Sequence, residues 1–90
     1  MLIDPNTYLN IKTAATTQVY SGPCSLEAIV INTPANGTIT IIDDVSGNTS
    51  TIATIAANTP AGFYRYNVRC AKGIRIITAA TTDITVVFRD

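Results

Sequence analysis

The sequence contains no histidine and no tryptophan. Without an imidazole the chain cannot form a Ser-His-Asp triad or a Cys-His pair, so these classes of nucleophilic catalysis are excluded. Two separated cysteines are too few for a zinc site of the usual nitrogen and sulfur ligands. Glycine-rich phosphate loops of the GxGxxG and GxxxxGK[ST] types are also missing. We therefore predict no catalytic residues, no metal and no cofactor.

Acidic residues are few, and their spacing gives only weak support for a calcium site or for catalysis by carboxylates. Asp43 and Asp44 open the stretch 43–48, whose oxygen atoms are those of a calcium loop but whose spacing matches no established one. The same residue types commonly form a turn after a strand, which is the interpretation we favour. A glycosidase would need two carboxylates at a controlled separation, and Asp43 with Glu27 or Asp83 is the pair left open.

Charge is scarce throughout the chain. Charged residues make up 13% of the sequence, against about 25% in an average globular protein. Hydrophobic residues make up 47%, and the formal net charge is zero. A free monomer usually carries charge on about 25–35% of its surface. We infer that part of the surface is buried against partners, and the alternative is a monomer coated with Thr, Asn and Ser.

Long apolar runs and export signals are missing as well. No run approaches the ~18–20 residues that cross a bilayer, so no membrane partner is expected. The start MLIDPNTYLNIK lacks a basic region followed by an apolar one, so we expect no signal peptide and synthesis in the cytoplasm. Cys24 and Cys70 allow one disulfide, but two buried thiols are the favoured interpretation for a chain without an export signal.

The residues that the chain has in abundance are β-branched: 13 Ile, 15 Thr and 6 Val, against 3 Leu. Such residues favour strands. Turn signals rich in Gly, Pro and Asn separate eight strand-like runs: residues 7–13, 17–21, 24–32, 37–43, 50–57, 62–70, 73–79 and 83–89. Short strands at this spacing predict one all-β domain over residues 1–90. We expect a single β-sandwich of about eight strands, jelly-roll-like, with an immunoglobulin-like sandwich as the alternative.

Several of these runs carry apolar side chains on both faces. In 24–32, for example, Leu26 and Val30 mark one face while Ile29 and Ile31 mark the other. A two-layer sandwich needs only one apolar face per sheet, so the second set predicts an interface between copies, or a loop folded over the sheet. The candidate interface residues are the out-of-phase ones: Ile29, Ile31, Ile42, Ile77 and Val87.

The stretch YRYNVRCAKGIRII (64–77) holds four of the six basic residues. A three-residue turn predicts a hairpin in which Val68 faces Ile76. Its reverse face then sets Arg69 opposite Arg75, although like charges in such positions repel. We expect either pairing with carboxylates of neighbouring strands or docking to an acidic partner surface, with nucleic acid the weaker candidate for a neutral chain. The candidate docking residues are Arg65, Arg69, Lys72 and Arg75.

Three stretches hold distinctive runs of strand and turn residues: INTPANGTITIID (31–43), FYRYNVRCAKGIRIIT (63–78) and TDITVVFRD (82–90). Together they resemble a group of small all-β proteins encoded in tailed-phage and prophage genomes, often near virion structural genes. The resemblance covers roughly residues 18–90. It implies a virion part, such as a capsid decoration or cement protein, with no catalytic residues. The chain departs from the pattern at Arg69, Cys70 and Arg75, so the resemblance does not explain the basic stretch.

The leading hypothesis is therefore a phage virion structural protein that is made in the host cytoplasm and found in the virion. We expect a homo-oligomer, a homotrimer first, that joins its copies through sheet faces and docks on the major capsid protein or another virion protein. The alternative is a tail or surface-binding module for a glycan or receptor, which predicts exposed aromatic residues on loops. A carboxylate enzyme would need converging carboxylates, and we expect no enzyme.

Overall fold

The computed structural model describes residues 7–89, so residues 1–6 and Asp90, which the single-domain prediction includes, lie outside it. The eight predicted strands are confirmed, with ends that differ by at most two residues. They are β1 (Thr7–Ile11), β2 (Thr16–Ser21), β3 (Cys24–Thr33), β4 (Ile39–Ile42), β5 (Thr51–Ile55), β6 (Gly62–Cys70), β7 (Gly73–Thr78) and β8 (Asp83–Arg89).

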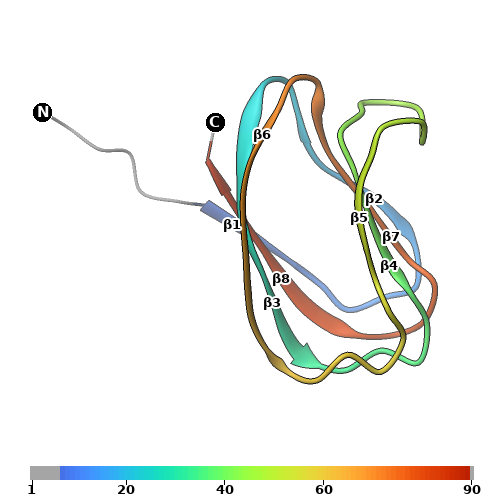
Figure 1. The fold of residues 1–90 in the computed structure, drawn as a ribbon. Helices are drawn as coiled ribbons and strands as arrows, with labels where there is room; N and C mark the ends of the chain where they lie inside the picture. The colour runs from blue at the N-terminus through green and yellow to red at the C-terminus, as the bar shows by residue number, and fades with distance from the viewer. Residues whose placement is uncertain (1–6, 90) are drawn as a thin grey trace, which may run out of the picture.

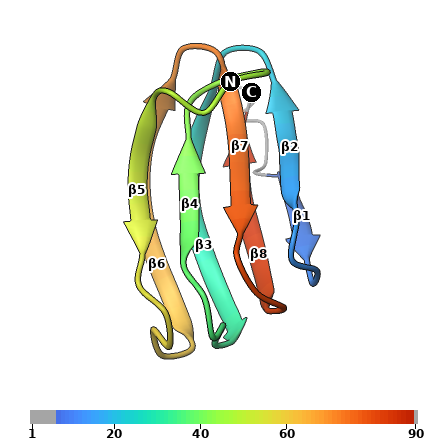
Figure 2. The same ribbon diagram turned by 90° about the vertical axis from the view of Figure 1, so that its right-hand side faces the viewer.

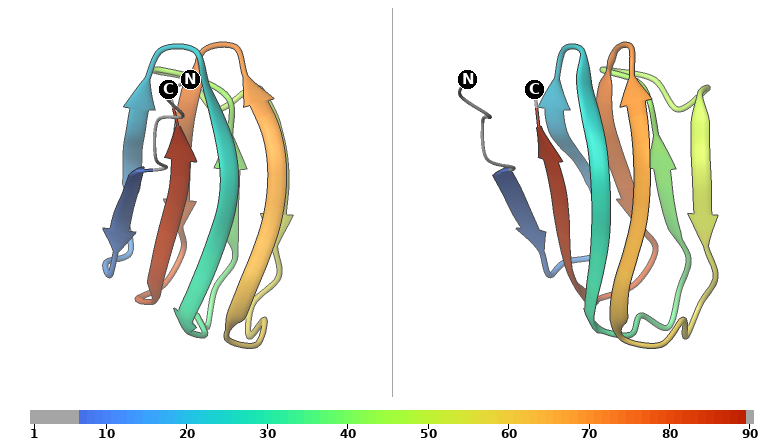
Figure 3. Two further views of the ribbon diagram at one scale, coloured as in Figure 1. Left: turned by 90° about the vertical axis from the view of Figure 1, so that its left-hand side faces the viewer. Right: turned by 60° about the vertical axis from the view of Figure 1, so that its left-hand side comes forward.

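The strands form two four-stranded antiparallel sheets that face each other (Figure 1). Sheet A has the order β1-β8-β3-β6, and sheet B has the order β2-β7-β4-β5. Sheet B lies in front in Figure 2, and sheet A lies in front in the left view of Figure 3. Successive strands alternate between the sheets except from β4 to β5. This is the strand order of a jelly roll, so the jelly-roll prediction is confirmed over the immunoglobulin-like alternative.

The core lies between the sheets and is built mainly from isoleucines. Ile29 and Ile84 of sheet A and Ile41 and Ile76 of sheet B are fully buried there. Burying one such side chain contributes about 1.5–3 kcal/mol. The β-branched residues thus favour the strand backbone and also supply the apolar layer that holds the two sheets together.

A β-bulge in β3 explains the two out-of-phase isoleucines of that strand. The register shifts between Leu26 and Ala28, so Glu27 is an extra residue relative to β8. One extra residue reverses the alternation of inward and outward side chains. Leu26 and Ile29 therefore both point into the core. Since Ile29 and Ile31 are only 0% and 2% exposed, the prediction that they join copies of the chain is wrong.

Ile42 is also buried, at 1% exposure, but it lies outside the core cluster. Its register partner on β7 is Arg75, on the outer side of sheet B. Arg75 donates hydrogen bonds to Val45 O and to Asn48 Oδ1, which places the β4–β5 loop beside Ile42. A loop folded over the sheet, the alternative to an interface, therefore covers Ile42, and its prediction as an interface residue is wrong.

The last two predicted interface residues lie on opposite sides of the sandwich. Ile77 of β7 is paired with Thr16 and Thr40 on the outer face of sheet B. Val87 of β8 is paired with Tyr8 on the outer face of sheet A. Both side chains are half-buried. The five predicted interface residues therefore do not form one surface.

β6 and β7 do not form the predicted hairpin. β6 pairs with β3 in sheet A, and β7 pairs with β2 and β4 in sheet B, so the turn between them carries the chain across the sandwich. Val68 lies opposite Leu26 and not opposite Ile76. Arg69 and Arg75 consequently sit on opposite outer faces, and the predicted repulsion between them does not arise.

Candidate interaction surface

The turn between β6 and β7 is held by the carboxylate of Asp43. Asp43 Oδ2 accepts the Ala71 N–H at 3.0 Å, and Oδ1 accepts the N–H groups of Lys72 and Gly73 at 2.9 and 3.2 Å. Desolvation raises the pKa of Asp43, but these hydrogen bonds and the charge of Lys72 outweigh it, so the pKa is lowered from 3.8. Asp43 therefore has a structural role at this end of the sandwich.

The variant Asp43→Asn is expected to lose about 1–3 kcal/mol of stability at pH 7, because an amide cannot accept from all three N–H groups. The folded pKa of Asp43 is lowered, so its stabilisation is present above the unfolded value of 3.8 and is lost as the pH falls through the folded value. Urea unfolding at pH 7 and pH 3 gives the free energy of unfolding of each protein. The difference between wild type and Asp43→Asn should be smaller at pH 3 than at pH 7. Glu27→Gln is the control. An equal gap at both pH values would contradict the role of the charge.

Cys24 and Cys70 lie opposite each other on β3 and β6, and both are buried. No disulfide joins them, so the structure has the two buried thiols that the sequence favoured. Burial, with smaller contributions from Cys24 and Asp43, raises the pKa of Cys70 to about 11. Because the thiolate is the reactive form, the thiol of Cys70 should react slowly near neutral pH.

We expect iodoacetamide at pH 8 to alkylate Cys70 of the folded protein roughly 100-fold more slowly than Cys70 of the chain in guanidinium, where its pKa returns to about 8.5. Mass spectrometry at timed intervals follows the modification. The denatured wild type serves as its own control. Labelling at equal rates in both states would show that the thiol of Cys70 is open to solvent.

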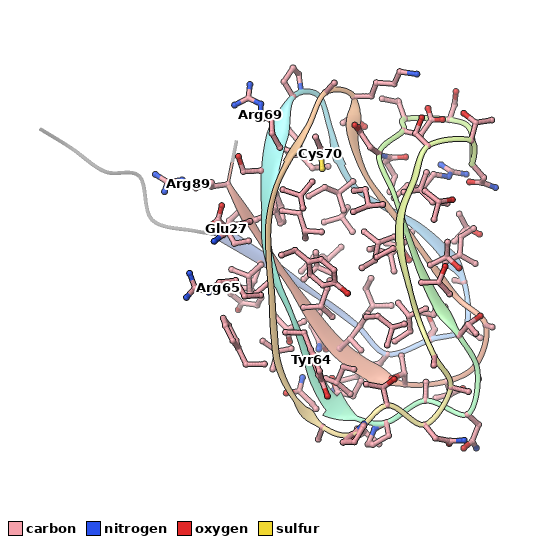
Figure 4. All side chains as sticks on the ribbon, in the orientation of Figure 1. Glu27, Tyr64, Arg65, Arg69, Cys70 and Arg89 are labelled. Carbon is pink, nitrogen blue, oxygen red and sulfur yellow. The ribbon has the colours of Figure 1, made fainter. Side chains whose placement is uncertain are left out.

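The four predicted docking residues do not gather on one surface. Arg65 and Arg69 project from the outer face of β6, and Lys72 is exposed in the turn that follows. Arg75 lies on sheet B, where its guanidinium donates hydrogen bonds to the Gln18 side chain of β2 and to the β4–β5 loop. Arg89 of β8 joins Arg65 and Arg69 instead (Figure 4). Alternation in 83–89 places Arg89 outward with Val87, a signal that sequence analysis did not use.

Exposed aromatic side chains lie on the outer face of sheet A. Tyr8 on β1 is 70% exposed and Phe63 on β6 is 60% exposed, and these are the two edge strands of the sheet. Val87 and Val30 lie half-buried on the strands between them, with buried Ala28 beside Val87 in the register. The centre of this face is therefore apolar and its edges are aromatic.

Three arginines frame this apolar centre. Arg65 Cζ lies 5.8 Å from the centroid of the Phe63 ring, a cation–π contact that restrains both side chains. Arg69 and Arg89 are the register partners of Ser25 on its two sides. Two strand spacings place their backbones about 10 Å apart. We call this set of outward residues on sheet A the arginine face: Tyr8, Val30, Phe63, Arg65, Arg69, Val87 and Arg89.

At the other end of the same sheet, Asp83 is held by two asparagines. Asn10 Nδ2 and Asn32 Nδ2 donate to Asp83 Oδ1 at 2.7 and 3.2 Å. Both amides also reach Thr85 Oγ1, at 3.3 and 3.2 Å. These hydrogen bonds, with a smaller contribution from Lys12, lower the pKa of Asp83. The carboxylate is therefore satisfied within the subunit.

The carboxylates considered for catalysis do not converge. Asp43 binds the β6–β7 turn, Glu27 projects from the outer side of β3, and Asp83 lies at the far end of sheet A. Within residues 7–89, no three His, Cys, Asp or Glu side chains come together as a metal site, and no pocket is found. None of the described residues belong to a helix long and apolar enough to span a bilayer.

Comparison with protein-family models, with curated proteins and with solved structures finds no match to this chain. Function is therefore inferred from the chain's own residues and from the surface they build. The candidate interaction surface is the arginine face, because large aromatic side chains are exposed on it together with arginines.

Proposed function

We propose that the chain is a structural subunit of a bacteriophage virion, a capsid decoration or cement protein that docks through the arginine face. The observation that supports this is the exposure of Tyr8 and Phe63 at the edges of an apolar sheet centre framed by arginines. Tyrosine, phenylalanine and arginine are enriched at protein interfaces, and tyrosine and arginine are prominent among the residues that dominate their binding energy. A broad sheet face presents these groups to another surface over its full width.

The virion part of the proposal comes from the resemblance carried by residues 31–43, 63–78 and 82–90. These stretches form parts of β3, β4, β6, β7 and β8 and so belong to both sheets. Jelly rolls occur in viral capsid domains and in lectin domains. The fold thus agrees with a virion role without deciding it, because one fold serves many functions.

The size of the arginine face favours repeated weak contacts. Four strands about 4.8 Å apart and seven residues rising about 3.3 Å each give a footprint of roughly 19 by 23 Å. That footprint is about half of the ~800 Å² that each partner contributes to a standard interface. A single contact should therefore be weak. A homotrimer on a capsid lattice would gain avidity by engaging several sites at once.

Purified capsids that lack the protein provide the test. We expect the wild type to co-sediment with them at a fixed stoichiometry and to scatter light as an oligomer at micromolar concentration. The variant Tyr8→Ser with Phe63→Ser should keep its melting temperature and lose capsid binding. Val45→Ser is the matched control, since Val45 is an exposed apolar residue on a loop away from this face. A monomeric wild type that does not bind capsids would overturn the proposal.

The second candidate is a glycan-binding or receptor-binding module. It predicted exposed aromatic residues on loops, whereas Tyr8 and Phe63 lie on strands. Three strand spacings separate them by about 14 Å, so their rings do not make one continuous platform. Binding to an oligosaccharide array, together with failure to bind capsids, would favour this candidate.

A further inference from the structure

We infer that the partner surface docked at the arginine face is an acidic protein surface, and that it is not a second copy of this chain. The inference rests on the proposed function only in taking the partner to be a virion protein. Its basis is the balance of charge on the face and the places where those charges lie.

The arginine face carries more positive charge than its own sheet neutralises. Arg65, Arg69 and Arg89 project from it, and Glu27 is the carboxylate beside them (Figure 4). Asp83 lies at the far end of the same sheet, and the positive charge of Lys12, which contributes to lowering the pKa of Asp83, offsets its charge there. Within residues 7–89 none of the three arginines forms a salt bridge. Counted over the described residues 7–89, two net positive charges on this face are therefore left for a partner.

A second copy is a poor match for this surface. In a two-fold dimer the same patch meets itself, so two surfaces of net positive charge would be brought together. Like charges brought together across an interface cost several kcal/mol. An acidic partner surface would instead be attracted by the three arginines, and this attraction would raise the association rate.

The spacing of the arginines specifies the partner further. Arg69 and Arg89 flank Ser25 with backbones about 10 Å apart, so two carboxylates at that separation would meet both. Each pair can form two parallel hydrogen bonds, the strongest common form of ion pair. Tyr8 and Phe63 then require apolar recesses on the partner, on either side of the contact made by the valines.

Nucleic acid fits this surface less well than an acidic protein. Single strands bind by stacking successive bases on neighbouring rings, and the two rings here lie on opposite edge strands. A phosphate backbone would also leave Val30 and Val87 at the centre of the face unmatched. A protein surface with an acidic rim and an apolar centre matches all of these groups.

The test is a titration of the ¹⁵N-labelled full chain followed by NMR. The probes are a 12-residue peptide of Glu, Leu and Ser, the same peptide with Lys for each Glu, and the oligonucleotide (dT)12. We expect shift changes on the outer residues of sheet A with the acidic peptide alone. Affinity should fall roughly tenfold when the ionic strength rises from 50 to 500 mM, because exposed charges are screened.

Variants at the three arginines separate charge from folding. The triple change Arg65→Ser, Arg69→Ser and Arg89→Ser should abolish peptide binding and leave the melting temperature nearly unchanged. Lys72→Ser removes one exposed positive charge outside the face and should change affinity less than twofold. Equal binding of the lysine peptide, tighter binding of (dT)12, concentration-dependent shifts at this face without any probe, or no shift at all would each overturn the inference.

The two proposals fail in different ways. If the wild type binds the acidic peptide but not capsids, the virion role is overturned and the acidic partner stands. If the triple arginine variant still binds capsids as the wild type does, the virion role stands and the acidic partner is overturned.

Discussion

Replacing Gly73 by alanine is expected to cost about 3 kcal/mol of stability, the upper end of what overpacking usually costs. A Cβ at Gly73 would lie within 3.0 Å of Tyr20 O, closer than real Cβ atoms come to any neighbour. It would also meet Asp44 O at 3.2 Å and Gln18 Nε2 at 3.3 Å. Backbone oxygens in a paired strand and a loop cannot retreat as a flexible side chain can, so the turn itself would have to move. That movement would also weaken the hydrogen bond from the Gly73 N–H to the carboxylate of Asp43.

Urea unfolding at pH 7 measures the effect, and Gly62→Ala is the matched control. A Cβ at Gly62 meets only ring atoms of Tyr64, at ordinary contact distances of 3.6–3.8 Å. The control should stay within about 0.5 kcal/mol of the wild type. Similar losses for both alanine variants would mean that the close approach of Gly73 to Tyr20 is not present in solution.

Ile29→Ala should cost about 2–5 kcal/mol of stability, while Val30→Ala should cost less than about 1 kcal/mol. The two residues are neighbours in β3 and similar in size. Ile29 is fully buried in the core, whereas Val30 is half-buried on the outer face. The difference between them is set by the bulge at Glu27, which decides which of the two points inward.

Chemical denaturation of both variants, with light scattering of each at micromolar concentration, distinguishes the two possible roles of Ile29. Loss of stability without a change in oligomeric state is expected for a core residue. A stable Ile29→Ala variant with altered oligomeric state would restore Ile29 to an interface. A larger loss for Val30→Ala than for Ile29→Ala would contradict the register of β3.

The strands were predictable because their signals are local. β-branched residues favour extended backbone, and Gly, Pro and Asn mark the turns, so all eight strands can be located from neighbouring residues alone. The inward face of β6 was also predictable, since Tyr64, Tyr66 and Val68 alternate with polar residues, and the two tyrosines pack against the core.

The partners of the strands were not predictable in the same way. A short turn containing glycine joins β6 to β7. Cys70 and Ile74 point into the core whether this turn makes a hairpin within one sheet or carries the chain from one sheet to the other. What decides is that Cys70 pairs with Cys24, which is 46 residues away in the chain. The sequence around the turn contains no trace of that pairing.

The bulge at Glu27 misled the sequence analysis for a related reason. In the sequence, an isoleucine that breaks the alternation of apolar and polar residues has two explanations. Either the strand has a second apolar face, or a bulge adds one residue to the strand and turns the isoleucine inward. The insertion is visible only against β8, where Leu26 and Ala28 pair with adjacent residues. Arg65 and Arg69 were correctly predicted to point outward, but their companion Arg89 comes from β8 and not from the β6–β7 stretch.

The position of β8 has a consequence for the order in which the molecule assembles. β1 pairs with β8 alone, so the first described strand has no neighbour in its sheet until the last one has been synthesised. Closing loops of that length before any gain from pairing slows folding, and sandwiches of this kind fold in milliseconds to seconds. A nascent chain that stops before residue 83 would leave one edge of β3 and all of β1 without partners, and such open edges promote aggregation. Sheet A therefore cannot be completed before β8 has been synthesised.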